Sequence, residues 1–191
     1  ATCDGFLFRD KHVVVIGGGD TAMEDALVLA RTSSKVTIIH RRDTFRASHI
    51  LAKRVHEHPN IFIKWNTTVV SFDGEKTKDG EPILKQVKVQ NVNTESIETI
   101  EVEGAFVAIG HDPNTKYMKE GLVDMDQGGY VLTQPDTSKT SLPGLFAAGD
   151  VADKVYRQAI TSAGSGAMAA LDAERWLSEH GITFEESVEV D

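Results

Sequence analysis

Two short segments of this 191-residue sequence have the residue types and spacing of a nucleotide-binding site. The first is His12–Ala22 (HVVVIGGGDTA), where the spacing Gly17-x-Gly19-x-x-Ala22 follows an apolar run. A sharp turn from strand into helix needs the backbone freedom of Gly17, and the bare backbone of Gly19 lets a pyrophosphate come close. Ala22 is small enough for the helix to pack on the strand. The amides at the start of that helix would then bind the phosphates of a dinucleotide.

The second segment indicates which dinucleotide. A strand predicted at 35–39 ends in His40-Arg41-Arg42, and Arg46 follows. A site for NAD usually has an acid here, which binds the ribose 2′-hydroxyl. Three arginines instead favour a 2′-phosphate, which guanidinium groups bind through forked, charge-assisted hydrogen bonds. The alternative is an exposed helix start, which fits less well because a first helical turn prefers acids. The expected ligand is NADPH.

The composition excludes several other classes of protein. The net charge of −9 argues against general nucleic-acid binding, and 40% hydrophobic residues are ordinary for a globular protein. No apolar run approaches the roughly 20 residues that span a bilayer, and we expect neither a membrane segment nor a signal peptide. A single cysteine suits a reducing cytoplasm. The acidic end, 185–191, is expected to be solvated.

The elements that would position these segments form an α/β domain over residues 1–110. Apolar runs predict parallel strands at 12–16, 35–40, 61–65 and 105–110, the last of them buried. Helical periodicity predicts helices at 20–31 and 45–58, the second with Ile50, Leu51 and Val55 facing inward. Alternating residues predict an antiparallel β-meander at 69–72, 84–92 and 96–102, laid across the parallel sheet.

Residues 111–191 are expected to form a second unit after a polar joint at 111–115. Short strands are predicted at 129–133 and 141–150, and a long helix rich in Ala, Ser and Gly at 158–177. These pieces resemble part of a larger domain, because one helix and two short strands give little material for a core. Three histidines, His49, His56 and His58, are expected to be exposed rather than to bind a metal, since the last two cannot share a helical face.

With these motifs in place, the sequence resembles bacterial-type, low-molecular-weight thioredoxin reductase over nearly its whole length. The resemblance is carried by ATCDG at 1–5, VIGGG at 15–19, HRRDTFR at 40–46, VAIGH at 107–111, FAAGDV at 146–151 and YRQAITSAG at 156–164. It implies a Rossmann-like NADPH-binding domain at 1–110, followed at 111–191 by the C-terminal part of an FAD-binding domain of the same superfamily.

The resemblance also implies the site residues and the partners. Cys3 would be the flavin-facing redox thiol and Asp4 the acid that handles its proton. The candidate NADP-binding residues are Gly17, Gly18, Gly19, Asp20, Thr21, Arg41, Arg42, Arg46 and Gly110. The candidate FAD-binding residues are Gly149, Asp150, Val151, Arg157, Gln158 and Ala159. The implied activity passes a hydride from NADPH to FAD and then electrons to a Cys-x-x-Cys disulfide and to thioredoxin, in a cytoplasmic homodimer.

Two departures from the family accompany this resemblance. The redox motif of the family is Cys-Ala-Thr-Cys, of which this chain holds only the second cysteine, and the N-terminal flavin fingerprint is absent. The sequence is therefore expected to be a fragment that is inactive alone. Two alternatives stay open: a peroxiredoxin-reductase-type flavoprotein, disfavoured because its equivalent loop carries an acid, and a non-catalytic NADPH-binding module.

Overall fold

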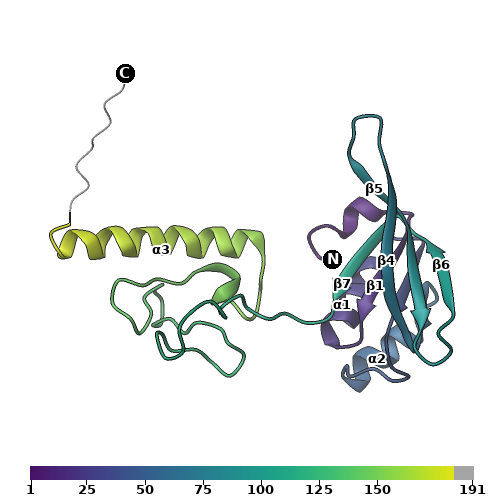
Figure 1. The fold of residues 1–191 in the computed structure, drawn as a ribbon, viewed down its shortest axis with the longest axis horizontal. Coiled ribbons are helices and arrows are strands. Elements are labelled where there is room, and N and C mark those ends of the chain that lie inside the picture. The colour runs from purple at the N-terminus through teal and green to yellow at the C-terminus, as the bar shows by residue number, and fades with distance from the viewer. Residues whose placement is uncertain (183–191) are drawn as a thin grey trace. The chain divides into compact units, whose positions relative to one another are not determined.

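A computed structural model describes residues 1–182, and the predicted acidic end at 185–191 lies outside the described part (Figure 1). The chain divides into two compact units, Ala1–Gly110 and His111–Asp191. The first contains all the strands of the described chain, and the second contains its longest helix. Each unit is described by itself below.

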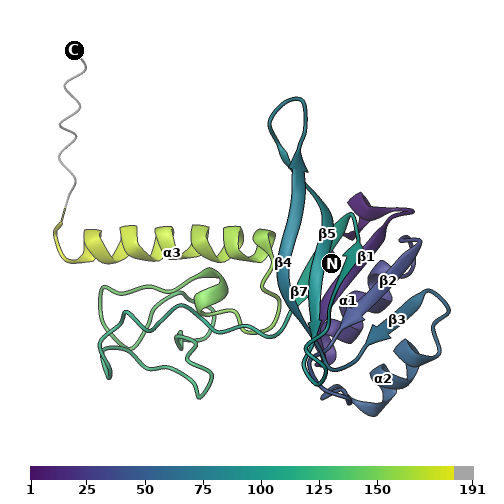
Figure 2. The same ribbon diagram turned by 45° about the vertical axis from the view of Figure 1, so that its right-hand side comes forward.

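The first unit is built on a parallel sheet whose strand order is β3-β2-β1-β7 (Figure 2). The strands are β1 (His12–Gly17), β2 (Lys35–Ile39), β3 (Ile61–Lys64) and β7 (Gly104–Ala108). The four apolar runs that predicted parallel strands do form parallel strands. β7 lies at the edge of the sheet, however, and its Val107 is 62% exposed, so the prediction of a fully buried strand was wrong there.

Two helices follow the first two strands. α1 (Asp20–Leu29) buries Ala22, Met23, Ala26 and Leu29 against the sheet, in a cluster that also contains Val13, Val15, Val36 and Ile38. α2 (His49–His56) begins four residues later than predicted, because the backbone N–H groups of Arg46 and Ala47 donate to the carbonyl of Gly18 instead of continuing a helix. The prediction that Ile50 faces inward was wrong, since it is 72% exposed at the start of α2.

The predicted meander is an antiparallel sheet with the order β4-β5-β6. β4 (Thr67–Lys76) and β5 (Pro82–Asn91) are longer than the alternation indicated, and β6 (Ile97–Glu101) is slightly shorter. Val87, Val89 and Val102 form a second buried cluster with Val14 and Ile39 of the parallel sheet. The fold class is therefore confirmed: a mixed α/β unit in which an antiparallel sheet packs over a parallel one.

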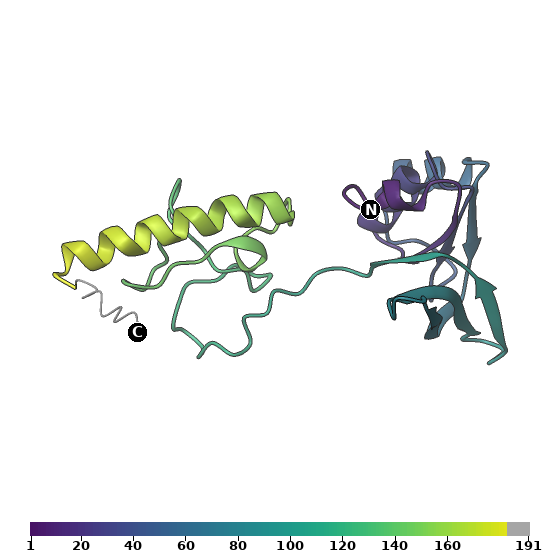
Figure 3. The same cartoon turned by 90° about the horizontal axis from the view of Figure 1, so that it is seen from above.

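The second unit contains the short 3-10 turn η2 (Gly149–Val151) and the 21-residue helix α3 (Ala159–Glu179), close to the predicted helix. α3 is the long helix of this unit in Figure 3, and the loops of the unit lie along one side of α3 in Figure 1. The strands predicted at 129–133 and 141–150 were wrong, because these segments form only the isolated bridges Met125–Val131 and Lys139–Phe146. Neither segment finds the continuous partner that a β-ladder needs.

Other anchors hold these loops. The buried carboxylate of Asp172 on α3 accepts hydrogen bonds from the backbone N–H (2.9 Å) and the hydroxyl (2.7 Å) of Ser138. The backbone N–H of Val131 donates to the carbonyl of Val151 at 3.0 Å. Within residues 1–182, no helix is both long and apolar enough to cross a bilayer.

Candidate functional site

The glycine turn between β1 and α1 has the geometry that its spacing predicts. Gly17 has a φ of 153°, and a Cβ added there would lie 2.2 Å from the carbonyl oxygen of Ala108 and 2.9 Å from the Cβ of Ala22. Glycine at 17 and a small residue at 22 are thus required by the contact of β1 with β7 and α1. A Cβ added at Gly19 would meet no atom within 4 Å. The backbone at Gly19 therefore faces open space in which a ligand fits.

Gly18 joins this turn to the arginine-bearing loop. A Cβ at Gly18 would lie 2.2 Å from the ring of His40, so the imidazole packs directly on the glycine backbone. The carbonyl of Gly18 accepts hydrogen bonds from the N–H groups of Arg46 (2.8 Å) and Ala47 (3.2 Å). The carboxylate of Asp20 accepts one from the N–H of Ser48 at 2.6 Å. The two predicted segments are consequently one structural element.

A cavity of about 410 Å³ lies above this element. It is bordered by the glycine turn with Thr21, by the three arginines Arg41, Arg42 and Arg46, and by Gly110 after β7. Asp20 is the one predicted NADP-binding residue that is not on its wall. The carboxylate of Asp20 instead fastens the loop through Ser48.

Several wall residues were missed by sequence reasoning. Thr67, Thr68 and Val69 border the cavity from the start of β4, and His40 borders it beside the arginines. The signal for His40 was its place directly before Arg41. The threonines gave no signal, because the strand was predicted to begin only at Val69.

The electrostatics of the cavity are dominated by guanidinium groups. The side chains of Arg41, Arg42 and Arg46 are all exposed, so their guanidinium groups are accessible to an anion. Burial of the His40 ring lowers its pKa, and the charges of the three arginines lower it further, against an opposing hydrogen bond to the carbonyl of Thr44 (2.9 Å). His40 is therefore neutral at neutral pH, and the positive charge available to an anion is that of the arginines.

In the second unit, the predicted flavin residues fall into two groups near the start of α3. The N–H of Gly149 donates to the hydroxyl of Ser165 (3.0 Å), and the hydroxyl of Ser162 donates to the carboxylate of Asp150 (3.2 Å). These bonds tie η2, and with it Val151, to the first two turns of α3.

The second group is the sequence Arg157-Gln158-Ala159. Arg157 has the left-handed φ of 49°, Gln158 caps α3 in a capping box with Thr161, and Ala159 is the first residue of the helix. The backbone at these three positions is therefore fixed by the way in which α3 begins.

The candidate redox residues lie at the start of the chain. Cys3 is exposed, and Asp4, also exposed, precedes the 3-10 helix η1 (Gly5–Phe8). The carbonyl of Asp4 accepts a hydrogen bond from the N–H of Leu7 at 3.1 Å. Among residues 1–182, no group of three or more His, Cys, Asp or Glu side chains could hold a metal ion.

Residues 2–166 match the family described as pyridine nucleotide-disulphide oxidoreductase. The chain belongs to this family. The pyridine nucleotide-disulphide oxidoreductases use flavin and nicotinamide cofactors, and the glycine turn, open at Gly19 and beside three arginines, fits the nicotinamide nucleotide. The predicted resemblance is thereby confirmed at the level of this broader family.

Named relatives within the family are thioredoxin reductases. The chain is 53% identical over 183 residues to "Thioredoxin reductase 1, mitochondrial" of Arabidopsis thaliana, a match that covers 95% of this chain and 48% of that protein. It is 48% identical to "Bifunctional thioredoxin reductase/thioredoxin" of Mycobacterium leprae, covering 100% of this chain and 41% of that one. The chain spans about half the length of the curated relatives that it matches.

A solved structure shows the same likeness in three dimensions. The thioredoxin reductase of Giardia duodenalis superposes with a TM-score of 0.76 at 40% identity, over 93% of this chain and 56% of that one.

Proposed function

We propose that this chain provides the NADPH-binding unit and part of the FAD-binding unit of a thioredoxin-disulfide reductase. The observation that carries the proposal is the cluster of Arg41, Arg42 and Arg46 on the wall of the nucleotide cavity, at the position where an NAD site has an acid. The relatives named thioredoxin reductase support the reaction.

In this proposal the glycine turn binds the diphosphate of NADPH. The N–H groups at the start of α1 face the anion, and the helix dipole favours negative charge there. Arg41, Arg42 and Arg46 bind the 2′-phosphate through charge-assisted hydrogen bonds. The neutral ring of His40 braces the loop against Gly18 and adds no charge of its own.

The remaining assignments follow the family resemblance. FAD is held by Gly149, Asp150 and Val151 together with Arg157, Gln158 and Ala159. The FAD held there would supply two-electron redox chemistry between NADPH and a cysteine disulfide. Cys3 supplies one sulfur and Asp4 manages its proton, after which the dithiol reduces thioredoxin through a mixed disulfide.

The proposed setting is a cytoplasmic homodimer that serves thioredoxin. Because the sequence contains one cysteine, the 191 residues cannot form an internal disulfide, and we expect no reductase turnover from them alone. Measurable turnover with thioredoxin would show that this disulfide is dispensable.

The test of the nucleotide assignment is the double variant Arg41→Ala/Arg42→Ala. Hydrogen bonds to charged groups contribute about 1.5–3 kcal/mol each, so the Kd for NADPH should rise at least about tenfold. The Kd for NADH should change little, because NADH lacks the 2′-phosphate. Isothermal titration calorimetry with each nucleotide measures both values.

A matched control keeps the same change in net charge. Arg31 and Arg54 are exposed and do not border the cavity, so Arg31→Ala/Arg54→Ala should leave both Kd values within about twofold of the wild type. An equal loss of NADPH and NADH affinity in the Arg41/Arg42 variant would remove the phosphate assignment.

A further inference from the structure

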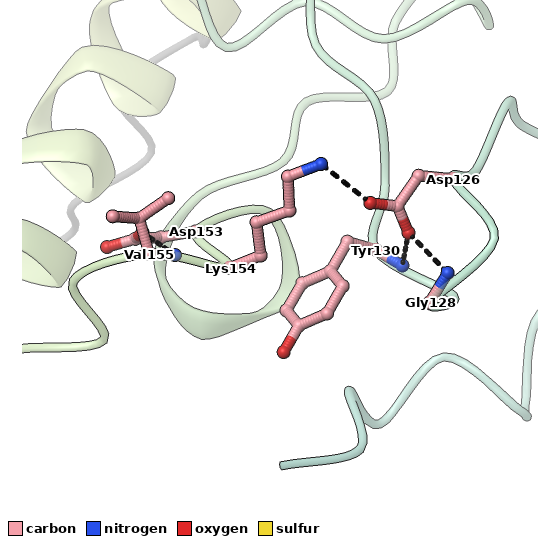
Figure 4. Close-up of polar contacts among 6 residues, drawn as sticks. All are labelled: Asp126, Gly128, Tyr130, Asp153, Lys154 and Val155. Carbon is pink, nitrogen blue, oxygen red and sulfur yellow. Dashed lines mark hydrogen bonds and ion pairs between the residues drawn. The ribbon is translucent and has the colours of Figure 1, made fainter. Parts of the chain in front are cut away.

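The segment between η2 and α3 is organised by one carboxylate. Oδ1 of Asp153 accepts a hydrogen bond from the N–H of Val155 at 2.9 Å (Figure 4). The same oxygen accepts one from the N–H of Tyr156, also at 2.9 Å. Oδ2 accepts from the N–H of Arg157 at 3.0 Å and from the hydroxyl of Thr161 at 3.3 Å, a hydroxyl whose proton is shared with the carbonyl of Gln158 at 2.9 Å. Four donors within residues 155–161 thus converge on a single half-buried side chain.

These bonds determine the path of the backbone into α3. Arg157 has a φ of 49°, a conformation that a residue with a side chain rarely adopts without support from its surroundings. Its N–H points to Oδ2 of Asp153, which supplies that support. Thr161 also accepts the N–H of Gln158 at 3.3 Å, so one hydroxyl links Asp153 to the helix cap.

A second carboxylate fixes the same segment from the adjoining loop. The ammonium group of Lys154 lies 3.0 Å from Oδ2 of Asp126, whose Oδ1 accepts the N–H groups of Gly128 (2.8 Å) and Tyr130 (3.1 Å) (Figure 4). The side chain next to Asp153 is therefore tied to a loop that is itself closed by hydrogen bonds.

The apolar side chains of this segment contribute little to holding it. Val155 is 66% exposed and Tyr156 is 69% exposed. The conformation of the segment is consequently maintained by the hydrogen bonds to Asp153. The bonds from backbone N–H groups, that of Tyr156 foremost, also lower the pKa of the Asp153 carboxyl group. This carboxyl group is thus ionised and accepts all four bonds at neutral pH.

We infer that Asp153 is a positioning residue for flavin binding: it sets the backbone of Arg157, Gln158 and Ala159 without touching the flavin itself. The inference rests on the proposed function, in which these three residues contact the flavin. Asp153 is not one of the residues proposed to contact the flavin. Its replacement should alter the flavin site and leave the nucleotide site of the first unit unchanged.

Two variants divide the role of the carboxylate. Asp153→Asn keeps an acceptor for Val155 and Tyr156 but replaces Oδ2 with an amide NH₂, which cannot accept from Arg157 or Thr161. Asp153→Ala removes all four bonds. Glu174→Ala is the matched control, because Glu174 is an exposed carboxylate on α3 outside this network.

The experiment uses the flavin-loaded protein and measures three quantities for each variant. These are the Kd for FAD after removal and reconstitution of the flavin, the visible absorption spectrum of the bound flavin, and the Kd for NADPH. Asp153→Ala should raise the FAD Kd at least about tenfold. Asp153→Asn should raise it less and shift the flavin absorption bands, while the NADPH Kd stays within about twofold. Glu174→Ala should match the wild type in all three.

The outcomes separate this inference from the proposed function. A reductase that contains the wild-type chain but binds no FAD would overturn both. A wild-type protein that binds FAD, with both Asp153 variants showing its affinity and spectrum, would overturn the inference alone. If Asp153→Asn lowers the helix content in circular dichroism, Thr161→Val, which removes the hydroxyl that links Asp153 to the helix cap, takes its place beside Thr161→Ser, which keeps that hydroxyl. A flavin spectrum shifted in Thr161→Val alone supports the role, and an unshifted one refutes it.

Discussion

Each of the two units of this protein is stabilised internally by a different kind of interaction. Both clusters of buried apolar residues lie in the first unit, around β1, β2 and α1 and between the two sheets. In the second unit the described buried apolar side chains are Pro113, Val123, Tyr130 and Val131, whereas Ile160, Met168 and Leu171 of α3 are exposed. Carboxylates of Asp126, Asp153 and Asp172 organise its loops instead.

This difference explains where each candidate site gets its geometry. The nucleotide cavity lies at the ends of strands whose positions follow from apolar packing, and its glycine turn is set by contacts with Ala22 and Ala108. The flavin segment is set by side-chain acceptors that bind backbone N–H groups. We therefore expect the nucleotide site to tolerate the loss of a single hydrogen-bonding side chain better than the flavin segment does.

The largest expected effect is on the apolar packing of the first unit. Leu29 is fully buried in α1, whereas Leu171 in α3 is 51% exposed. Leu29→Ala should lower the free energy of unfolding by about 2–5 kcal/mol, and Leu171→Ala by no more than about 0.5 kcal/mol. Urea unfolding followed by circular dichroism measures both. Equal losses would mean that the two units do not differ in this way.

Replacing a glycine by alanine should change the free energy of unfolding in opposite directions in the two units. Gly17→Ala places a Cβ 2.2 Å from the carbonyl oxygen of Ala108, so it should cost about 1–3 kcal/mol and weaken nucleotide binding. Gly164→Ala in α3 meets no atom within 4 Å and should stabilise by about 0.5–1 kcal/mol through its helix propensity. Thermal unfolding of the two variants checks this, and destabilisation by Gly164→Ala would contradict it.

Acid should weaken the two units over different pH ranges. Burial lowers the pKa of His12 and His40 in the first unit, so their neutral forms stabilise the fold above about pH 6.5, and that contribution falls as these rings become charged at lower pH. Hydrogen bonds from Ser138 lower the pKa of Asp172, as those from Tyr156 lower that of Asp153. Their contribution is present above the ordinary carboxyl pKa of about 3.9 and is lost as pH falls through the lowered values.

Hydrogen exchange of individual amides resolves this difference. Between pH 7 and pH 5, protection at β1 should decrease while that of the N–H groups of Ser138 and Arg157 stays constant, after correction for intrinsic exchange rates. Below about pH 4 the second group should lose protection. Asp172→Asn should remove part of that acid transition, and an unchanged transition in this variant would refute the role of Asp172.

The sequence was most informative where an apolar pattern stands next to a position at which the backbone geometry requires a particular residue type. Gly17, Gly19 and Ala22 could be placed because a strand, a sharp turn and a helix each leave a residue-type requirement at a fixed spacing. The arginines could be placed because they follow the next apolar strand. Thr67 and Thr68 could not, since the register that brings β4 to the cavity depends on contacts far apart in the sequence.

The second unit shows where pattern reasoning fails. Segments at 129–133 and 141–150 have strand-like composition, yet they lack continuous ladder partners, and Ser138 is held by a carboxylate 34 residues away. Similarly, Asp153 looks like an ordinary turn residue in the sequence. Its four hydrogen bonds become visible only once the loop is folded. Such interactions have no periodicity from which to predict them.

The measurement that tests the central claim most directly is a comparison of 2′,5′-ADP with 5′-AMP by isothermal titration calorimetry on the wild-type chain. The two ligands differ only in the phosphate at the ribose 2′ position, so the comparison isolates the arginine cluster. The account predicts that 2′,5′-ADP binds at least about tenfold more tightly and that this advantage shrinks as salt is raised. Equal affinities, or a preference for 5′-AMP, would contradict it.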